Sequence, residues 1–230
     1  MADPAQNVSF PGDGGQAHGY LALPEAGSGP GLLVVQERWG LTTHLTTLVD
    51  RFAAEGFVAL APDLYDGATT HDPAEAAELL RRLPAERAAR ELRAAVDFLL
   101  GHPALLGDAI AVVGFCMGGG LALHLAAQEG DRVAAVVPFY GLPRESDYDY
   151  RGLTAHVLGH FAEQDRALTP ATVDEAAIRI GEATDRRPEI HFYPAGHAFM
   201  NDENLSGTYD PLQARIAWRR TLSFLRGHLG

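Results

Sequence analysis

The chain has 230 residues, and its 18 Lys and Arg against 30 Asp and Glu give a formal net charge of −12. This length fits one α/β domain with a sizeable core, and the negative balance argues against a nucleic-acid backbone or an anionic membrane surface as partner. A single cysteine excludes an intramolecular disulfide and a Cys-x-x-Cys zinc site. Hydrophobic residues at 47% and charged residues at 21% are typical of a globular protein rather than a disordered one.

The N-terminal segment carries no targeting signal in our interpretation. Residues 1–6 lack the basic start and the apolar core of a secretory signal, and no apolar run is long enough to cross a bilayer. A lone cysteine is typical of a reducing compartment. We therefore predict a cytoplasmic protein that has no membrane partner.

The first half of the chain alternates strands and helices. Residues 7–23 predict an antiparallel hairpin around a Pro- and Gly-rich turn, and residues 31–37 form an apolar run that ends in polar residues. That pattern indicates a buried parallel strand whose carboxyl end reaches a site. Residues 43–55 have helical spacing of apolar positions, and 57–61 predict a second buried strand stopped by a proline.

Two helices are expected next. Asp72-Pro73 is a helix start with an N-cap and a first-turn proline, and residues 84–100 predict a long amphipathic helix. The arginines of this region are expected on a solvated face, with a substrate contact as the alternative. They are Arg81, Arg82, Arg87, Arg90 and Arg93.

The second half continues the alternation. Strands are expected over 109–114, 133–139, 154–161 and 189–193, with helices over 170–183 and from Asp210-Pro211 onward. Repeated alternation predicts an α/β fold with a mostly parallel, doubly wound sheet flanked by helices. No repeat or low-complexity linker divides the chain, so we expect a single domain over residues 1–230.

Residues 113–120 read as a strand, a sharp turn and the start of a helix, with Cys116 in a Gly-x-Cys-x-Gly-Gly turn. Small neighbours permit the strained backbone of a nucleophile elbow, and the positive end of a helix dipole favours a thiolate. The alternative is a buried structural cysteine beside a glycine-rich turn. An isolated Gly-x-Cys-x-Gly pattern favours that alternative.

Three further polar residues follow predicted strands: Glu37, Asp165 and His197. The chain order Cys116, Asp165, His197 is the order of nucleophile, acid and histidine in α/β-hydrolases. In these roles His197 pairs with the thiolate and moves protons, while Asp165 fixes its tautomer. Alone, Asp165 is better explained as a turn or cap residue before Thr169-Pro170. The joint occurrence at strand ends favours a hydrolase.

An oxyanion hole is expected beside the thiol. The backbone N–H of Met117, at the predicted helix start, is one donor, and a second comes from the loop after the Glu37 strand, at Arg38. Each donor is worth roughly 3 to 4 kcal/mol in the transition state.

Five segments together resemble the dienelactone hydrolase family, the carboxymethylenebutenolidases. They are residues 34–41, 61–65, 114–119, 139–141 and 193–199, and the resemblance runs from about Ala17 onward. It implies a monomeric α/β-hydrolase with a Cys-His-Asp triad and no cofactor. It also implies that Glu37 contacts the resting thiol and takes its proton when substrate binds, since a carboxylate and a thiolate in contact repel. The alternative for Glu37 is an N-terminal cap of the following helix.

The substrate is less well defined by the sequence. Family enzymes that cleave dienelactone hold its carboxylate with two arginines, but this chain has Asn201 at one of these positions, and neither Arg81 nor Arg82 can be assigned to the other. Aromatic residues near the predicted strand ends suggest an apolar substrate pocket, with core packing as the alternative. They are Trp39, Tyr65, Phe115, Tyr140 and Phe199.

We therefore predict a hydrolase of small-molecule esters or lactones. The closest alternative is a carboxylesterase or thioesterase that acts on neutral substrates. An alternative from another class is a non-catalytic small-molecule binder or a thiol sensor. A sensor needs a resolving cysteine, and the chain has no second one.

Overall fold

A computed structural model describes residues 5–12, 14–144 and 148–229. The chain forms two compact units, Met1–Ile110 and Ala111–Gly230. The single domain expected from the sequence stays a prediction. No helix in the described ranges is long and apolar enough to cross a membrane.

The strands of the first unit are β1 (Val8–Gly12), β2 (Gly15–Ala22), β3 (Gly29–Val35) and β4 (Val58–Pro62), in the order β1-β2-β4-β3. The β1–β2 and β2–β4 pairs are antiparallel, and β3–β4 is parallel. The predicted hairpin and the two buried strands are therefore confirmed. Asp13, in the predicted turn, lies outside the described residues.

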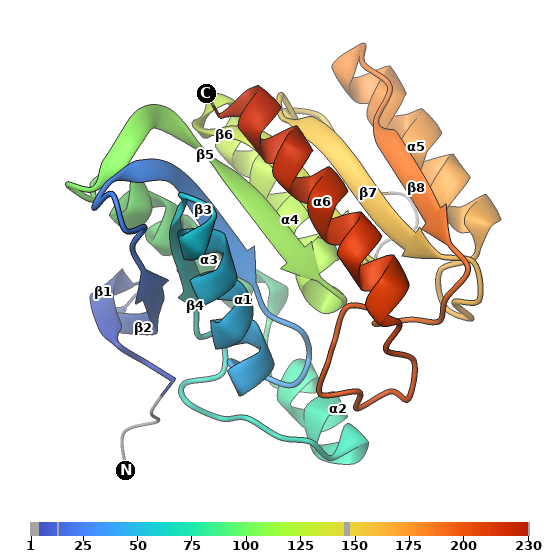
Figure 1. The fold of residues 1–230 in the computed structure, drawn as a ribbon, viewed down its shortest axis with the longest axis horizontal. Helices are drawn as coiled ribbons and strands as arrows, with labels where there is room; N and C mark the ends of the chain where they lie inside the picture. Colours follow the sequence, from blue (N-terminus) through green and yellow to red (C-terminus); the bar gives the residue numbers. More distant parts are fainter. Residues whose placement is uncertain (1–4, 13, 145–147, 230) are drawn as a thin grey trace. The chain divides into compact units, whose positions relative to one another are not determined.

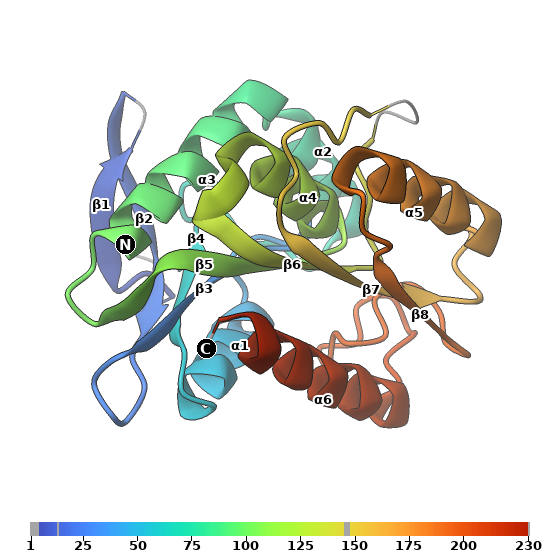
Figure 2. The same ribbon diagram turned by 90° about the horizontal axis from the view of Figure 1, so that it is seen from above.

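The helices of the first unit are α1 (Thr43–Ala54), α2 (Pro73–Arg81) and α3 (Ala85–Leu100). Figure 2 shows α1 and α3 on opposite faces of the β3–β4 pair. The predicted start of α2 is confirmed, because the side chain of Asp72 accepts hydrogen bonds from two backbone N–H groups of the first turn.

The arginines at the end of α2 face solvent. Arg81 and Arg82 both pair with Glu78, at 2.7 and 2.6 Å, and their side chains are 72% and 70% exposed. For these two residues the expected solvated face is confirmed.

The strands of the second unit follow β5 (Leu105–Phe115), which begins in the first unit and ends in the second. They are β6 (Val133–Phe139), β7 (His156–Ala162) and β8 (Glu189–Tyr193), in the order β5-β6-β7-β8 (Figure 1). The β6–β7 and β7–β8 pairs are parallel. Strand β5 starts four residues before the prediction, because its partly exposed first residues lack the apolar run that marks its buried end.

The helices of the second unit are α4 (Met117–Glu129), α5 (Pro170–Thr184) and α6 (Pro211–His228), with a short 3₁₀ turn at Gly130–Arg132. Figure 2 shows α4 and α5 on one face of the β6–β8 strands and α6 on the other. This layering brings the carboxyl ends of parallel strands to one edge, where ligand sites of such sheets form.

Candidate active site

The turn between β5 and α4 consists of one residue, Cys116, with φ 54° and ψ −120°. A residue with a side chain rarely adopts this conformation, and such strain persists only where the surroundings enforce it. At Gly114 a Cβ atom would lie 2.0 Å from the carbonyl oxygen of Gly118, so the close approach of strand and helix requires glycine there. The predicted strand, sharp turn and helix are confirmed.

The backbone at the end of β6 packs closely against the turn at Cys116. The N–H of Cys116 donates to the carbonyl of Phe139 at 3.0 Å. At Gly141 a Cβ atom would lie 1.8 Å from the carbonyl oxygen of Cys116. The strained cysteine is thus held in place by the neighbouring strand rather than by its own helix alone.

The side chain of His197 lies between Cys116 and Asp165. Its Nδ1 is 2.6 Å from Asp165 Oδ2, and its Nε2 is 3.3 Å from Cys116 Sγ. His197 follows β8, Cys116 follows β5, and Asp165 follows β7. The structure therefore brings together three of the residues that the sequence singles out.

Asp165 is both a turn residue and a partner of histidine. Its Oδ1 accepts from the backbone N–H groups of Ala167 and Leu168, at 2.8 and 3.2 Å, which leaves Oδ2 for His197. Burial raises the pKa of this carboxyl group, but the hydrogen bonds from His197 and the backbone outweigh it, and the pKa is lowered. Asp165 is therefore ionised at neutral pH.

The environment of His197 favours the charged imidazole. Burial lowers its pKa, whereas the hydrogen bonds to Asp165 and Cys116 raise it, and the result is a pKa of about 10. The hydroxyl of Thr208 donates to the carbonyl of His197 and holds the loop after β8. At neutral pH the arrangement therefore places a cation between a carboxylate and a sulfur atom.

Aromatic side chains pack on one side of His197. The ring of Tyr140 is 5.2 Å from that of His197, and Phe199 is 5.6 Å from Tyr140. Phe115 stacks on Phe139 at 4.8 Å. All of these aromatic residues except His197 are at most 1% exposed, so they pack in the core; a contact with substrate stays a prediction for Phe115, Tyr140 and Phe199.

Four further candidates, Glu37, Arg38, Trp39 and Tyr65, belong to the first unit. Glu37 is 4% exposed and follows β3, and the guanidinium of Arg38 lies 4.4 Å from the ring of Trp39. Tyr65 is also buried, and its N–H donates to Asp63 Oδ1 at 2.9 Å. The roles expected for these residues beside the thiol stay predictions.

Asn201 has a structural contact of its own. It is 3% exposed, and its Oδ1 accepts from the N–H of Glu203 at 3.0 Å. The side chain thus stabilises a turn, and a short amide at this position cannot replace the charge of an arginine.

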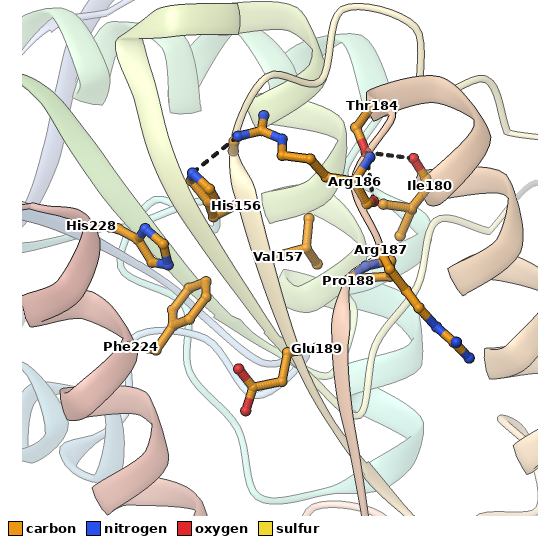
Figure 3. Close-up of a pocket in the computed structure, with 11 residues that line it drawn as sticks. His156, Val157, Ile180, Thr184, Arg186, Arg187, Pro188, Glu189, Phe224 and His228 are labelled. Carbon is orange, nitrogen blue, oxygen red and sulfur yellow. Dashed lines mark hydrogen bonds between the residues drawn. The ribbon is translucent and has the colours of Figure 1, made fainter.

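A separate hollow of about 160 Å³ lies at the opposite ends of β7 and β8, near His156 and Glu189. Figure 3 shows the guanidinium of Arg186 donating to Nε2 of His156, at 3.0 Å. His156 also stacks on His228, with ring centroids 4.0 Å apart. The hollow lies at the amino ends of β7 and β8, whereas Asp165 and His197 follow the carboxyl ends of these strands. The hollow is therefore distinct from the candidate active site.

Comparison with known proteins decides the family. The profile of the dienelactone hydrolase family matches residues 17–229, nearly the whole chain. The chain belongs to the dienelactone hydrolase family. The predicted resemblance is confirmed, and with it the α/β-hydrolase class of the fold.

Individual relatives of this family agree. The chain is 34% identical to protein usf of Aquifex pyrophilus, covering 97% of this chain and 99% of the relative. It is 32% identical to the carboxymethylenebutenolidase of Pseudomonas sp. strain P51, covering 93% and 91%. A solved structure of a Klebsiella pneumoniae protein, provisionally called a dienelactone hydrolase, has a TM-score of 0.83 at 29% identity and covers 95% and 96%.

One solved structure carries a further activity in its name. A dienelactone hydrolase-like promiscuous phosphotriesterase from metagenomic libraries has a TM-score of 0.85 at 26% identity, covering 98% of this chain and 100% of that protein. In the described part of this chain, no group of three or more His, Cys, Asp and Glu side chains gathers as a metal site.

Sequence reasoning missed the residues behind the triad. Thr208 holds His197, and the buried side chains of His160, Tyr193 and Thr221 are joined by hydrogen bonds. Tyr193 lies within a segment that carries the family resemblance, but nothing in the pattern predicted its partners. The signal that remained unused was a histidine inside the apolar run of β7.

Proposed function

We propose that this member of the dienelactone hydrolase family cleaves a small ester or lactone through a Cys116-His197-Asp165 triad. The observation that carries the proposal is the position of His197, 2.6 Å from Asp165 Oδ2 and 3.3 Å from Cys116 Sγ. The strained backbone of Cys116 supports it, because strain of this kind clusters at reacting groups. A buried structural cysteine needs neither feature.

In the first half of the reaction Cys116 Sγ, as thiolate, attacks the carbonyl carbon of the substrate. The carbonyl electron pair moves to oxygen and then returns, which breaks the bond to the leaving oxygen. His197 Nε2–H gives its proton to that leaving oxygen. A thioester and an alcohol result; in a lactone the alcohol stays attached to the acyl group.

In the second half His197, now neutral, takes a proton from water as the hydroxyl oxygen attacks the thioester carbon. The carbon–sulfur bond breaks, the acid product forms, and the thiolate is restored beside the imidazolium. Asp165 remains ionised and stabilises that cation throughout, as its lowered pKa favours.

Two backbone donors complete the proposal. The N–H of Met117, the first residue of α4, and that of Arg38 receive the oxyanion. Glu37 contacts the resting thiol and takes its proton when substrate binds. The low exposure of Glu37 and its place directly after β3 support this role, because they keep the carboxylate away from bulk water.

The family match also bears on the number of domains in the chain. The family match spans both compact units, which supports one α/β-hydrolase domain over residues 1–230. We extend the proposal to a cytoplasmic monomer that works on a small-molecule substrate without a cofactor.

The test compares the wild type with Cys116→Ala on a nitrophenyl acetate ester. We expect the variant to lose on the order of 10⁴-fold in kcat/KM or more, because the residual rate comes from binding and oxyanion stabilisation alone. Mass spectrometry of the quenched wild-type reaction should find the acyl group on Cys116. Circular dichroism checks that the variant folds. Equal rates for the two proteins would overturn the assignment of the nucleophile.

A further inference from the structure

Among the buried titratable residues that the proposed mechanism does not use, His160 is the most fully buried. His160 lies in β7, five positions before Asp165, and has 0% exposure. An imidazole without hydrogen-bond partners would be costly in such a place. Both of its ring nitrogens have partners, so the residue belongs to a fully connected polar network.

The network runs from helix α6 to the end of β8. His160 Nδ1 is 2.7 Å from the hydroxyl of Tyr193, and Nε2 is 3.0 Å from the hydroxyl of Thr221. Arg220 donates to the same Tyr193 oxygen at 3.1 Å. With that oxygen accepting from a cation, the phenol is the natural donor to Nδ1, and His160 carries its proton on Nε2.

Tyr193 is the residue at which the loops of the acid and the histidine meet. Its carbonyl accepts from the N–H of Glu163 at 2.8 Å and from that of Ala195 at 2.7 Å. Gln164 N–H donates to the carbonyl of Ala195 at 3.1 Å. A shift of Tyr193 therefore changes the position of one loop relative to the other.

A second connection runs through aromatic rings. Tyr193 contacts Phe199 at 4.9 Å, and Tyr140 bridges Phe199 and His197 at 5.6 and 5.2 Å. The N–H of Tyr140 donates to the carbonyl of His160 at 2.7 Å. The side chain of His160 thus supports Tyr193, and its backbone supports Tyr140, which contacts the ring of His197.

We propose that His160 and Tyr193 are positioning residues for the triad. Their hydrogen bond fixes the end of β8, and through it the distance from His197 to Asp165 and the plane of the His197 ring. The inference rests on the proposed function for its catalytic meaning. The positioning itself can be measured without turnover, because the protonation of His197 depends on its contact with Asp165.

The test is Tyr193→Phe, which keeps the ring and removes only the hydroxyl. We expect kcat to fall roughly 10- to 100-fold with KM within about twofold, because a small misplacement of reacting groups costs rate rather than binding. NMR of the imidazole groups should show the His197 titration moved from its high value toward 6.5. Tyr20→Phe is the matched control, since it removes a tyrosine hydroxyl bonded to Asp50 at 3.0 Å in the first unit.

The opposite result is equally specific. A lower Tm with an unchanged His197 titration and an unchanged kcat at 25 °C would overturn the inference and leave the network structural. If Tyr193→Phe does not fold, Thr221→Val releases the other side of the His160 ring, and the same titration decides. If Cys116→Ala keeps its activity, the proposed function fails, but the His197 titration still tests the positioning.

Discussion

Two histidines of the second unit lie near the same strand ends in opposite surroundings. His197 has a carboxylate and a thiol as partners and a side chain that is 33% exposed, and its pKa is raised to about 10. His160 has two hydroxyl partners and no exposure, and its pKa is lowered well below 6.5 by burial and by the nearby His191 and Arg220. The partners and the solvent, not the residue type, set the charge.

The difference in pKa suits the two histidines to different roles, proton transfer for His197 and structural support for His160. His197 can exist as a cation because Asp165 stabilises the charge, so it is able to give and take a proton during a reaction. His160 stays neutral because a charge there would be buried and close to the guanidinium of Arg220. A neutral ring with one donor and one acceptor suits a fixed support, and the contrast can be tested on each side.

The largest effect is expected at His197. His197→Ala should lower kcat by on the order of 10⁴-fold or more in ester hydrolysis, because the members of a triad act as a unit. His18→Ala, at an exposed position of β2, is the matched control and should keep the wild-type rate. A loss of only about tenfold at His197 would make it a peripheral residue and remove the contrast with His160.

The next effect concerns stability in acid. The unfolded chain binds a proton at His160 below about pH 6.5, while the folded protein does not, so this residue lowers stability as the pH falls through 6.5. The slope approaches about 1.4 kcal/mol for each pH unit. His160→Gln should therefore lose less stability than the wild type between pH 7 and 5.

Urea unfolding at the two pH values measures that difference. The variant is expected to be less stable at pH 7, because it lacks the paired imidazole, so the change with pH and not the absolute value is the readout. His18→Gln serves as control and should follow the wild-type slope. An unchanged slope in His160→Gln would mean that His160 is protonated in the folded protein.

The surroundings of His197 and of His160 also differ in how far they can be predicted from the sequence. Cys116, Asp165 and His197 each follow an apolar strand, so their meeting could be predicted from strand order and from the rule that parallel strands end at one edge. The strands and helices around them were found by the same periodicity. The sequence locates the reacting groups because their positions follow from the fold class.

The support around His160 follows from no such rule. Thr221 is 61 residues away along the chain and Tyr193 is 33, and their pairing with His160 depends on how α6 packs against β7 and on how β8 pairs with β7. The hydroxyl of Thr208, which holds the carbonyl of His197, comes from a loop without regular structure. Contacts between side chains of distant elements have no local pattern, and so the structure was needed to find them.

The smallest effect is expected at Glu37, and it tests whether the thiol beside His197 has a second acidic partner. Glu37→Gln removes a negative charge that disfavours the thiolate in the proposed resting state, so alkylation of Cys116 by iodoacetamide at pH 7 should become several-fold faster. Glu25→Gln, at an exposed position, is the matched control and should not change the rate. The N-cap of the following helix is Thr42, not Glu37 as the sequence alternative had it, so equal rates for Glu37→Gln and the wild type would leave Glu37 a buried structural residue. In that case Asp165 alone would supply the negative charge at the triad, and the contrast between His197 and His160 would rest on that single carboxylate.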